Sequence, residues 1–217
     1  MKRLCIACEG LTEVSFVTQV IKPHLEDLAP GRVSVSAPNL KGYRTYSETK
    51  KFVKNLLPSH GSGATVTTMI DLFKIPGDYP GLAEASHMTP VERVNELERR
   101  FVEDVDDHRF FAYLQLHEFE ALLLADVSAL IERHPSRRKE IHDLAARLDR
   151  DFESTEQVNR LRPPSYWIKD AAPAYNKKLD GPVVAAAIGL PRLRERCPHF
   201  GQWLRRAEEM ARTQGVA

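Results

Sequence analysis

The order of its apolar segments is the feature that most constrains how this chain folds. Short runs rich in apolar and β-branched residues alternate with longer segments whose apolar residues recur every three or four positions, as in strands alternating with helices. We expect strands near 4–8, 32–36, 65–71 and 109–116, and helices near 12–28, 47–57 and 89–104. Strands separated by helices pair in parallel through right-handed crossovers. The sequence therefore predicts an α/β fold with a mainly parallel four-stranded sheet flanked by helices.

After residue 126 the apolar pattern is helical. We expect an α/β core over residues 1–126 and a helical C-terminal part over 127–217 packed on that core, forming a single compact unit. A chain of 217 residues is long enough to bury one such core.

Composition restricts the class of protein only weakly. The 31 basic and 30 acidic side chains leave a formal net charge of +1, so a nucleic-acid-binding surface would have to be local. No apolar run approaches the ~20 residues of a membrane span. Three cysteines, an odd number, favour a reducing cytoplasm over a disulfide framework, and Cys5 and Cys8 lie inside a predicted strand, where we expect them to be buried.

Acidic residues follow three of the four predicted strands. Glu9 ends the first strand, Asp71 ends the third, and Glu118 follows the fourth directly after His117. The carboxyl ends of parallel strands share one edge of the sheet, where ligands of open α/β sheets bind. A strand also ends in a polar residue simply because the chain reaches solvent, so each acid taken alone has this simpler explanation.

A glycine turn joins the first strand to the first helix. Gly10 permits a close approach of the backbone, Thr12 is the expected N-cap, and Glu13 lies on the first helical turn. Carboxylates brought together repel one another and raise each other's pKa, unless a divalent cation lies among them. Mg²⁺ prefers oxygen ligands and suits a phosphate substrate, so the sequence predicts a Mg²⁺ (or Mn²⁺) site for phosphoryl or phosphodiester chemistry.

Several motifs resemble an uncharacterised bacterial family, the domain of unknown function DUF4276. They are residues 8–13 (CEGLTE), 67–71 (TTMID), 115–123 (QLHEFEALL), 175–177 (YNK) and 197–200 (CPHF). That family is similar to the Toprim domains of topoisomerases, primases and the overcoming-lysogenization-defect (OLD) nucleases. The resemblance covers nearly the whole chain and implies a Toprim-like, Rossmann-like fold.

The resemblance also implies roles for the acids. Glu9 and Asp71 would bind Mg²⁺ directly, and Glu13 would bind the metal or hold its waters. Glu9 has an alternative role as the general acid or base.

The chain departs from the Toprim pattern at Phe73, which occupies the position of the second acid of an Asp-x-Asp motif. This leaves open whether one or two metal ions bind. Glu118 or Asp78 could substitute as a ligand, and Glu118 is favoured because the end of a strand would fix its position.

Basic residues later in the chain are candidates for binding phosphate. Lys177 would stabilise negative charge in the transition state, as a late lysine does in the related nucleases, although a solvated surface lysine is an equal alternative. Lys169, Lys178 and Arg162 would form a rim around it. His117 would orient a water or touch phosphate, or it would simply bond to the backbone.

A second basic cluster lies between the predicted second strand and the following helix. Its members are Lys41, Arg44, Lys50, Lys51 and Lys54. It would contact a nucleic-acid backbone with salt-dependent affinity, or it would be a solvated helix face.

The leading functional hypothesis is a Mg²⁺-dependent, Toprim-like nuclease that cuts DNA or RNA. The resemblance implies a partner ATPase of the ABC type in a bacterial phage-defence system. The chain itself contains no G-x-x-x-x-G-K-[ST] phosphate loop. The alternatives are a non-catalytic partner or regulator of such an ATPase, and a phosphoesterase for small nucleotides. The sequence leaves the oligomeric state open, with a homodimer among the options.

Overall fold

The structure, a computed structural model, describes residues 1–42, 45–59, 64–73, 75–160 and 162–213. It divides into two compact units: unit 1 is Met1–Leu116 with Trp203–Ala217, and unit 2 is His117–Gln202. The expected boundary was at residue 126. In the structure the first unit ends earlier, at Leu116, and it also includes the last part of the chain from Trp203. Helix α5 (Glu120–Leu123) packs with later helices of unit 2, and the last helix, α10 (Pro198–Arg212), contributes its second part to unit 1.

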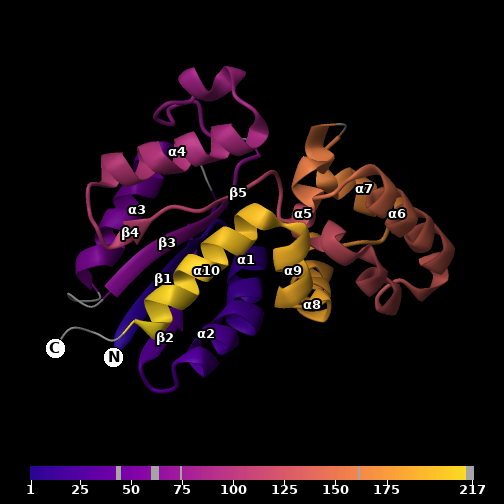
Figure 1. Cartoon of the computed structure of the whole chain (residues 1–217), viewed down its shortest axis with the longest axis horizontal. Coiled ribbons are helices and arrows are strands. Elements are labelled where there is room, and N and C mark those ends of the chain that lie inside the picture. Colours follow the sequence, from indigo (N-terminus) through magenta and orange to yellow (C-terminus); the bar gives the residue numbers. More distant parts are fainter. Residues whose placement is uncertain (43–44, 60–63, 74, 161, 214–217) are drawn as a thin grey trace. The chain divides into compact units, whose positions relative to one another are not determined.

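A parallel sheet forms the centre of unit 1 (Figure 1). Its strands are β1 (Lys2–Cys8), β2 (Val33–Ser36), β3 (Ala64–Asp71), β4 (Phe110–Phe111) and β5 (Leu114–Gln115). The order is β2-β1-β3-β4, β5 also pairs with β3, and every pairing is parallel. The predicted α/β fold with a mainly parallel sheet is therefore confirmed.

The fourth expected strand is divided in two, so the sheet has five strands and not four. Between β4 and β5, the backbone N–H of Tyr113 donates to the hydroxyl of Thr68, and that hydroxyl donates to the carbonyl of Tyr113, both at 2.9 Å. A side chain thus replaces the backbone partner at this point of the ladder. Beyond the interruption, β5 resumes pairing opposite Ile70 and Asp71.

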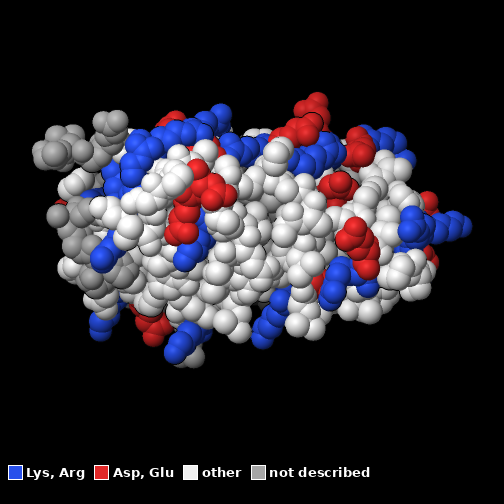
Figure 2. All heavy atoms as spheres, turned by 90° about the horizontal axis from the view of Figure 1, so that it is seen from below, with Lys and Arg blue, Asp and Glu red and all other residues white. Residues whose placement is uncertain are grey.

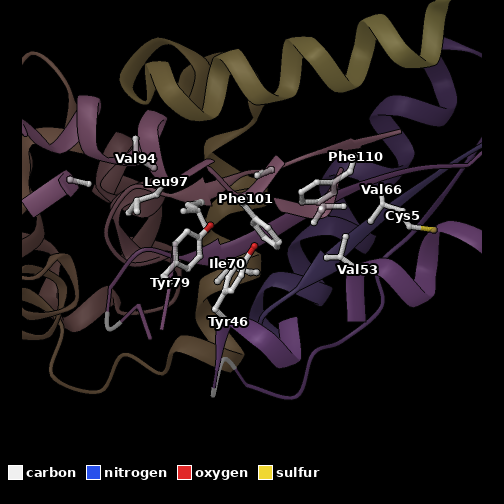
Figure 3. Packing of buried hydrophobic residues seen from close by; sticks show 14 of the residues in the cluster. Cys5, Tyr46, Val53, Val66, Ile70, Tyr79, Val94, Leu97, Phe101 and Phe110 are labelled. Atoms are coloured by element: carbon white, nitrogen blue, oxygen red, sulfur yellow. The ribbon is translucent and has the colours of Figure 1, made fainter. Parts of the chain in front are cut away.

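One face of the sheet is covered by α3 (Tyr46–Ser59) and α4 (Pro90–Val105), with a short 3₁₀ helix (Glu84–His87) before α4. An aromatic group made of Tyr46, Tyr79, Phe101 and Phe110 packs edge to face there, with ring centroids 4.8–5.9 Å apart (Figure 3). Edge-to-face pairs stabilise beyond the area they bury. The predicted start of α4 agrees with the structure, in which Thr89 caps the helix.

The opposite face of the sheet is covered by helices from both ends of the chain. A nearly continuous helix comprises α1 (Leu11–Phe16), a π-helical segment (Val17–Ile21) and α2 (Lys22–Leu28), and α10 lies on the same face (Figure 1). The indole N–H of Trp203 donates to the hydroxyl of Thr67 on β3 at 3.0 Å, and its ring stacks on Tyr113. His24 and Glu208 join α2 to α10. The end of the chain therefore completes the core of unit 1.

The regular elements among the described residues of unit 2 are all helices, joined by short loops. Its elements are α5, a 3₁₀ segment (Leu124–Glu132), a 3₁₀ turn (Pro135–Arg137), α6 (Arg138–Asp151), a 3₁₀ segment (Thr155–Arg160), α7 (Pro164–Ala171), α8 (Lys177–Ile188), α9 (Leu190–Arg196) and the start of α10. Leu122, Leu130, Ile141 and Ile168 are fully buried in it. The described regular elements from α5 to the start of α10 are thus all helices.

Surface charge is mixed in sign. Basic and acidic side chains are interspersed over the face drawn in Figure 2, as expected from nearly equal numbers of the two. In the part of the chain that the structure describes, no helix is both long and apolar enough to cross a bilayer.

Candidate active site

The ends of β1 and β3 bring two acidic residues to one edge of the sheet. The strands are neighbours, with Cys8 opposite Met69, so Glu9 and Asp71 emerge at the same edge. The backbone N–H of Glu9 donates to the carbonyl of Met69 at 3.0 Å, and the backbone N–H of Asp71 donates to Oε2 of Glu9 at 2.9 Å. The carboxylate of Glu9 therefore lies across the two strand ends, at the backbone of Asp71, whose side chain is buried.

A third carboxylate lies on the first turn of α1. Gly10, and not Thr12 as expected, is the N-cap, because Glu13 turns back and its Oε2 accepts the backbone N–H of Gly10 at 3.0 Å. Glu13 is only 4 % exposed. Burial, and secondarily the nearby Glu13 carboxylate, raises the pKa of the Cys8 thiol at the end of β1. A Cβ atom at Gly10 would lie 3.3 Å from Oε2 of Glu13, a tight contact. The absence of a side chain at Gly10 therefore leaves space for the Glu13 carboxylate.

The loop after β2 is bonded to the backbone of the same strand end. Leu40 N–H donates to the carbonyl of Cys8, and Gly42 N–H donates to the carbonyl of Glu9, both at 2.9 Å. Between them Lys41 is exposed, with φ 61°, and its N–H donates to Oδ1 of Asn39. The structure thus places one predicted phosphate-binding residue, Lys41, beside Glu9. Arg44 lies outside the described residues.

The structure places Asp78, a predicted metal ligand, at the start of α3. Its carboxylate accepts the backbone N–H groups of Tyr46 (2.9 Å) and Ser47 (3.3 Å) at the start of α3. These hydrogen bonds, the one from Tyr46 foremost, lower the pKa of Asp78. A negative charge is stabilised at a helix N-terminus, so the side chain serves as a cap for α3. Phe73, at the position of the expected second acid, is 37 % exposed after β3.

His117 begins unit 2 as a buried structural side chain. It is 7 % exposed, has φ 78°, and its Nε2 donates to the carbonyl of Glu156 at 2.8 Å. Burial lowers its pKa, opposed by the hydrogen bond to Glu156 and by Glu118. Of the two expectations for His117, the geometry agrees with bonding to the backbone.

Glu118 and Lys177 also have partners inside unit 2. The carboxylate of Glu118 accepts the backbone N–H of Ser165, in the first turn of α7, at 2.9 Å. Lys177 Nζ lies 3.5 Å from Oε2 of Glu120, a carboxylate only 3 % exposed, whose Oε1 lies 3.5 Å from the hydroxyl of Tyr175. Burial raises the pKa of Glu120, while Lys177 acts to lower it. The ammonium group of Lys177 therefore serves to compensate a buried carboxylate.

The expected rim of unit 2 is mostly exposed. Lys169 on α7 and Lys178 on α8 point to solvent, and Arg162 pairs with Asp170 at 2.6 Å. Glu9, Glu13, Asp71 and Lys41 belong to unit 1, whereas the residues from His117 to Lys178 belong to unit 2.

The sequence profile of one family, described as "Domain of unknown function (DUF4276)", matches residues 8–208. The chain belongs to this family. No curated protein matches the sequence. Two similar solved structures are C-terminal regions of OLD proteins. That from Xanthomonas campestris pv. campestris is 16% identical with a TM-score of 0.42, covering 94% of this chain and 97% of its own. That from Burkholderia pseudomallei is 16% identical with a TM-score of 0.45, covering 96% and 99%.

The acids of this DUF4276 chain fit a hard cation in chemistry but are not arranged as a ready metal site. Among the described residues, no three carboxylate, imidazole or thiol side chains converge as a metal-binding group. Glu9 and Glu13 instead bond to backbone N–H groups. The donors at this edge of unit 1 are nevertheless all carboxylate oxygens, which Mg²⁺ and Mn²⁺ prefer. Glu9, Glu13 and Asp71 are the residues that would hold such an ion.

Two structural features of the DUF4276 chain were not predicted from its sequence. Glu120 is the buried partner of Lys177, and the spacing of 57 positions between them gives no local signal. Asn39 shapes the loop beside Glu9. An asparagine two residues before a Lys-Gly pair is a turn signal that could have identified it.

Proposed function

We propose that this DUF4276 chain is a metal-dependent nuclease whose active centre is the acidic edge of unit 1. The observation that carries the proposal is the hydrogen bond between the Glu9 carboxylate and the backbone N–H of Asp71, at 2.9 Å, across the ends of two adjacent parallel strands. It places the carboxylate of Glu9 beside the backbone of Asp71 at the end of β3, and the buried Glu13 lies one helical turn along the chain. The substrate class, DNA or RNA, follows from the family resemblance.

Each acid has a separate task in this proposal. Glu9 and Asp71 bind Mg²⁺ or Mn²⁺, and Glu13 binds the ion or orients its waters. The bound ion would neutralise charge on the phosphodiester and lower the pKa of a coordinated water. The buried setting of Glu13 and Asp71 strengthens their electrostatic interaction with a cation, because fewer waters screen it.

A second candidate is a non-catalytic partner or regulator of an ABC-type ATPase. It is favoured by two observations: Phe73 stands where a second acid would be expected, and Glu9 and Glu13 are bonded to backbone N–H groups. In the nuclease proposal, the same ATPase is the partner that activates or directs cutting.

Cleavage assays distinguish the two candidates. Supercoiled plasmid, single-stranded DNA and RNA are incubated with the wild-type protein and with Glu9→Gln, Asp71→Asn and Asp78→Asn variants in Mg²⁺, Mn²⁺ or EDTA. We expect metal-dependent cutting that falls at least ~100-fold in the first two variants, since even groups that only orient metal ligands contribute 10–100-fold. Asp78→Asn is the matched control, because asparagine also caps helices.

Equal cutting by all four proteins would refute the proposed centre. If wild-type protein binds metal but cuts none of the substrates, and gains no activity with its ATPase, the second candidate is favoured.

A further inference from the structure

A groove of about 420 Å³ lies in unit 1 between the loop after β2 and one side of α3. Leu40 and Lys41 line it from the loop, and Phe52 lines it from the helix. Sites for small ligands typically enclose about 300–1,000 Å³, so the groove has room for one nucleotide.

One wall of the groove is fixed to the candidate active site. The N–H groups of Leu40 and Gly42 donate to the carbonyls of Cys8 and Glu9, and Cys8 forms an isolated parallel bridge with Asn39. These bonds extend the sheet pairing beyond the end of β1. A ligand in the groove would therefore contact a loop that is bonded to the backbone of Glu9.

The other wall is a single face of α3. Residues three or four positions apart lie side by side on a helix, and this face presents Glu48, Lys51, Phe52 and Asn55. The neighbouring Lys50 is on a different side, where its Nζ pairs with Asp104 at 2.8 Å. Lys54 also acts on Asp104, whose pKa it helps to lower. The helix lysines therefore divide, with Lys51 in the groove and the other two near α4.

The lining combines charge, apolar surface and hydrogen-bonding groups. Two ammonium groups, of Lys41 and Lys51, and one carboxylate, of Glu48, leave a net positive charge. The half-buried Phe52 offers a ring on which a base could stack, and Asn55 offers an amide to a base edge. This combination suits a nucleotide better than a simple anion. The carboxylate of Glu48 would repel an anion, and the ring of Phe52 would offer it no hydrogen-bond donor.

We propose that this groove binds one nucleotide of a single-stranded nucleic acid. Lys41 and Lys51 contact the phosphates on either side of the nucleotide, and its base stacks against Phe52 with its edge toward Glu48 and Asn55. A base within a duplex is already stacked and paired, so a single strand is the form that fits. This inference rests on the proposed nuclease function and adds that its substrate is single-stranded.

The test is binding without cutting. Fluorescence anisotropy of a labelled oligothymidylate of about 10 nucleotides, within the usual site size of single-strand-binding proteins, is measured in EDTA at several salt concentrations. The variants are Lys41→Gln/Lys51→Gln, Phe52→Leu and Phe52→Tyr. Lys54→Gln is the control, because it removes the same charge from the same helix on the side facing Asp104.

We expect the double lysine variant to bind more weakly and to reduce the slope of log K against log salt by about 1.4, or ~0.7 for each phosphate that is no longer neutralised by a lysine. Phe52→Leu should weaken binding about 5- to 150-fold, the range for removal of one stacked base, whereas Phe52→Tyr should retain it. Lys54→Gln should leave affinity within about twofold, and thermal melts check that all variants fold.

Three outcomes would contradict the proposed binding of a single strand in the groove. Lys54→Gln could weaken binding as much as the double variant, a duplex could bind more tightly than the single strand, or thymidine monophosphate could compete as well as the oligonucleotide. The last result would indicate a pocket for free nucleotides. The binding assay needs no metal, so it separates the two proposals. If the oligonucleotide binds in the groove but no substrate is cleaved, only the proposed nuclease function is refuted. If cleavage is metal-dependent but the groove variants bind as tightly as the wild type, only the proposed binding site is refuted.

Discussion

Thermal stabilisation by Mg²⁺ is the most direct prediction of the proposed metal site formed by Glu9, Glu13 and Asp71. An ion that binds only the folded chain stabilises it by RT ln(1 + [Mg²⁺]/Kd), which is about 1.4 kcal/mol at ten times Kd. For a chain of 217 residues this corresponds to a rise in Tm of roughly 3–6 °C. In Glu9→Gln the amide oxygen still accepts the N–H of Asp71, so without metal we expect a loss of only about 1 kcal/mol, the difference between a charged and a neutral acceptor. The Mg²⁺-dependent rise should disappear.

The assay is a circular-dichroism melt in EDTA and across a Mg²⁺ titration at constant ionic strength, so that general screening does not change. Asp78→Asn is the control, since its carboxylate caps α3 and its loss should leave the Mg²⁺ effect intact. An equal rise in wild type and Glu9→Gln would refute the assignment of Glu9 as a ligand. Loss of the rise in Asp78→Asn would move the site to the loop after β3.

Two further predictions concern unit 2. Burial lowers the pKa of His117 below 6.5, so the unfolded chain binds more protons and stability should fall as the pH drops below about 6.5. His117→Asn, which tolerates a positive φ, should flatten this dependence in urea unfolding at pH 5 and 7.5, and an unchanged slope would contradict it. Lys177→Met should cost about 1–2 kcal/mol because it leaves the Glu120 carboxylate buried without this cation, a value reduced because the Lys177 side chain is 35% exposed. Adding Glu120→Gln should recover most of that loss, and a double variant no more stable than the single one would refute the pairing.

The elements with strong local signals were predictable from the sequence. Thr89 and Pro90 mark the start of α4 because both the cap and the first-turn proline act within one turn. The interruption at Tyr113 was not predictable, because it depends on the hydroxyl of Thr68, 45 residues away in the chain. By contrast, the start of α1 after Gly10 had a local signal, because the Glu13 side chain three residues along the chain accepts the backbone N–H of Gly10.

The same distinction applies to the candidate site. The pairing of Glu9 with the end of β3 follows from a general property of parallel sheets, so the order of strands and helices was enough to predict it. The partner of Asp78 lies 32 residues earlier in the chain, at the start of α3, and no spacing rule connects them. The sequence around an acidic residue in a loop therefore does not distinguish a metal ligand from a helix cap.

The energetics of the carboxylates separate these two roles. Asp78 lies at a helix N-terminus, where the positive end of the helix dipole favours its charge, so a structural role accounts for it fully. Glu9 and Asp71 are different, because one hydrogen bond of 2.9 Å holds the carboxylate of the first against the backbone of the second. Glutamine at position 9 could also accept this N–H, so the hydrogen bond alone does not require a carboxylate there. The proposed cation would in addition account for an acidic residue at the end of each of the two strands.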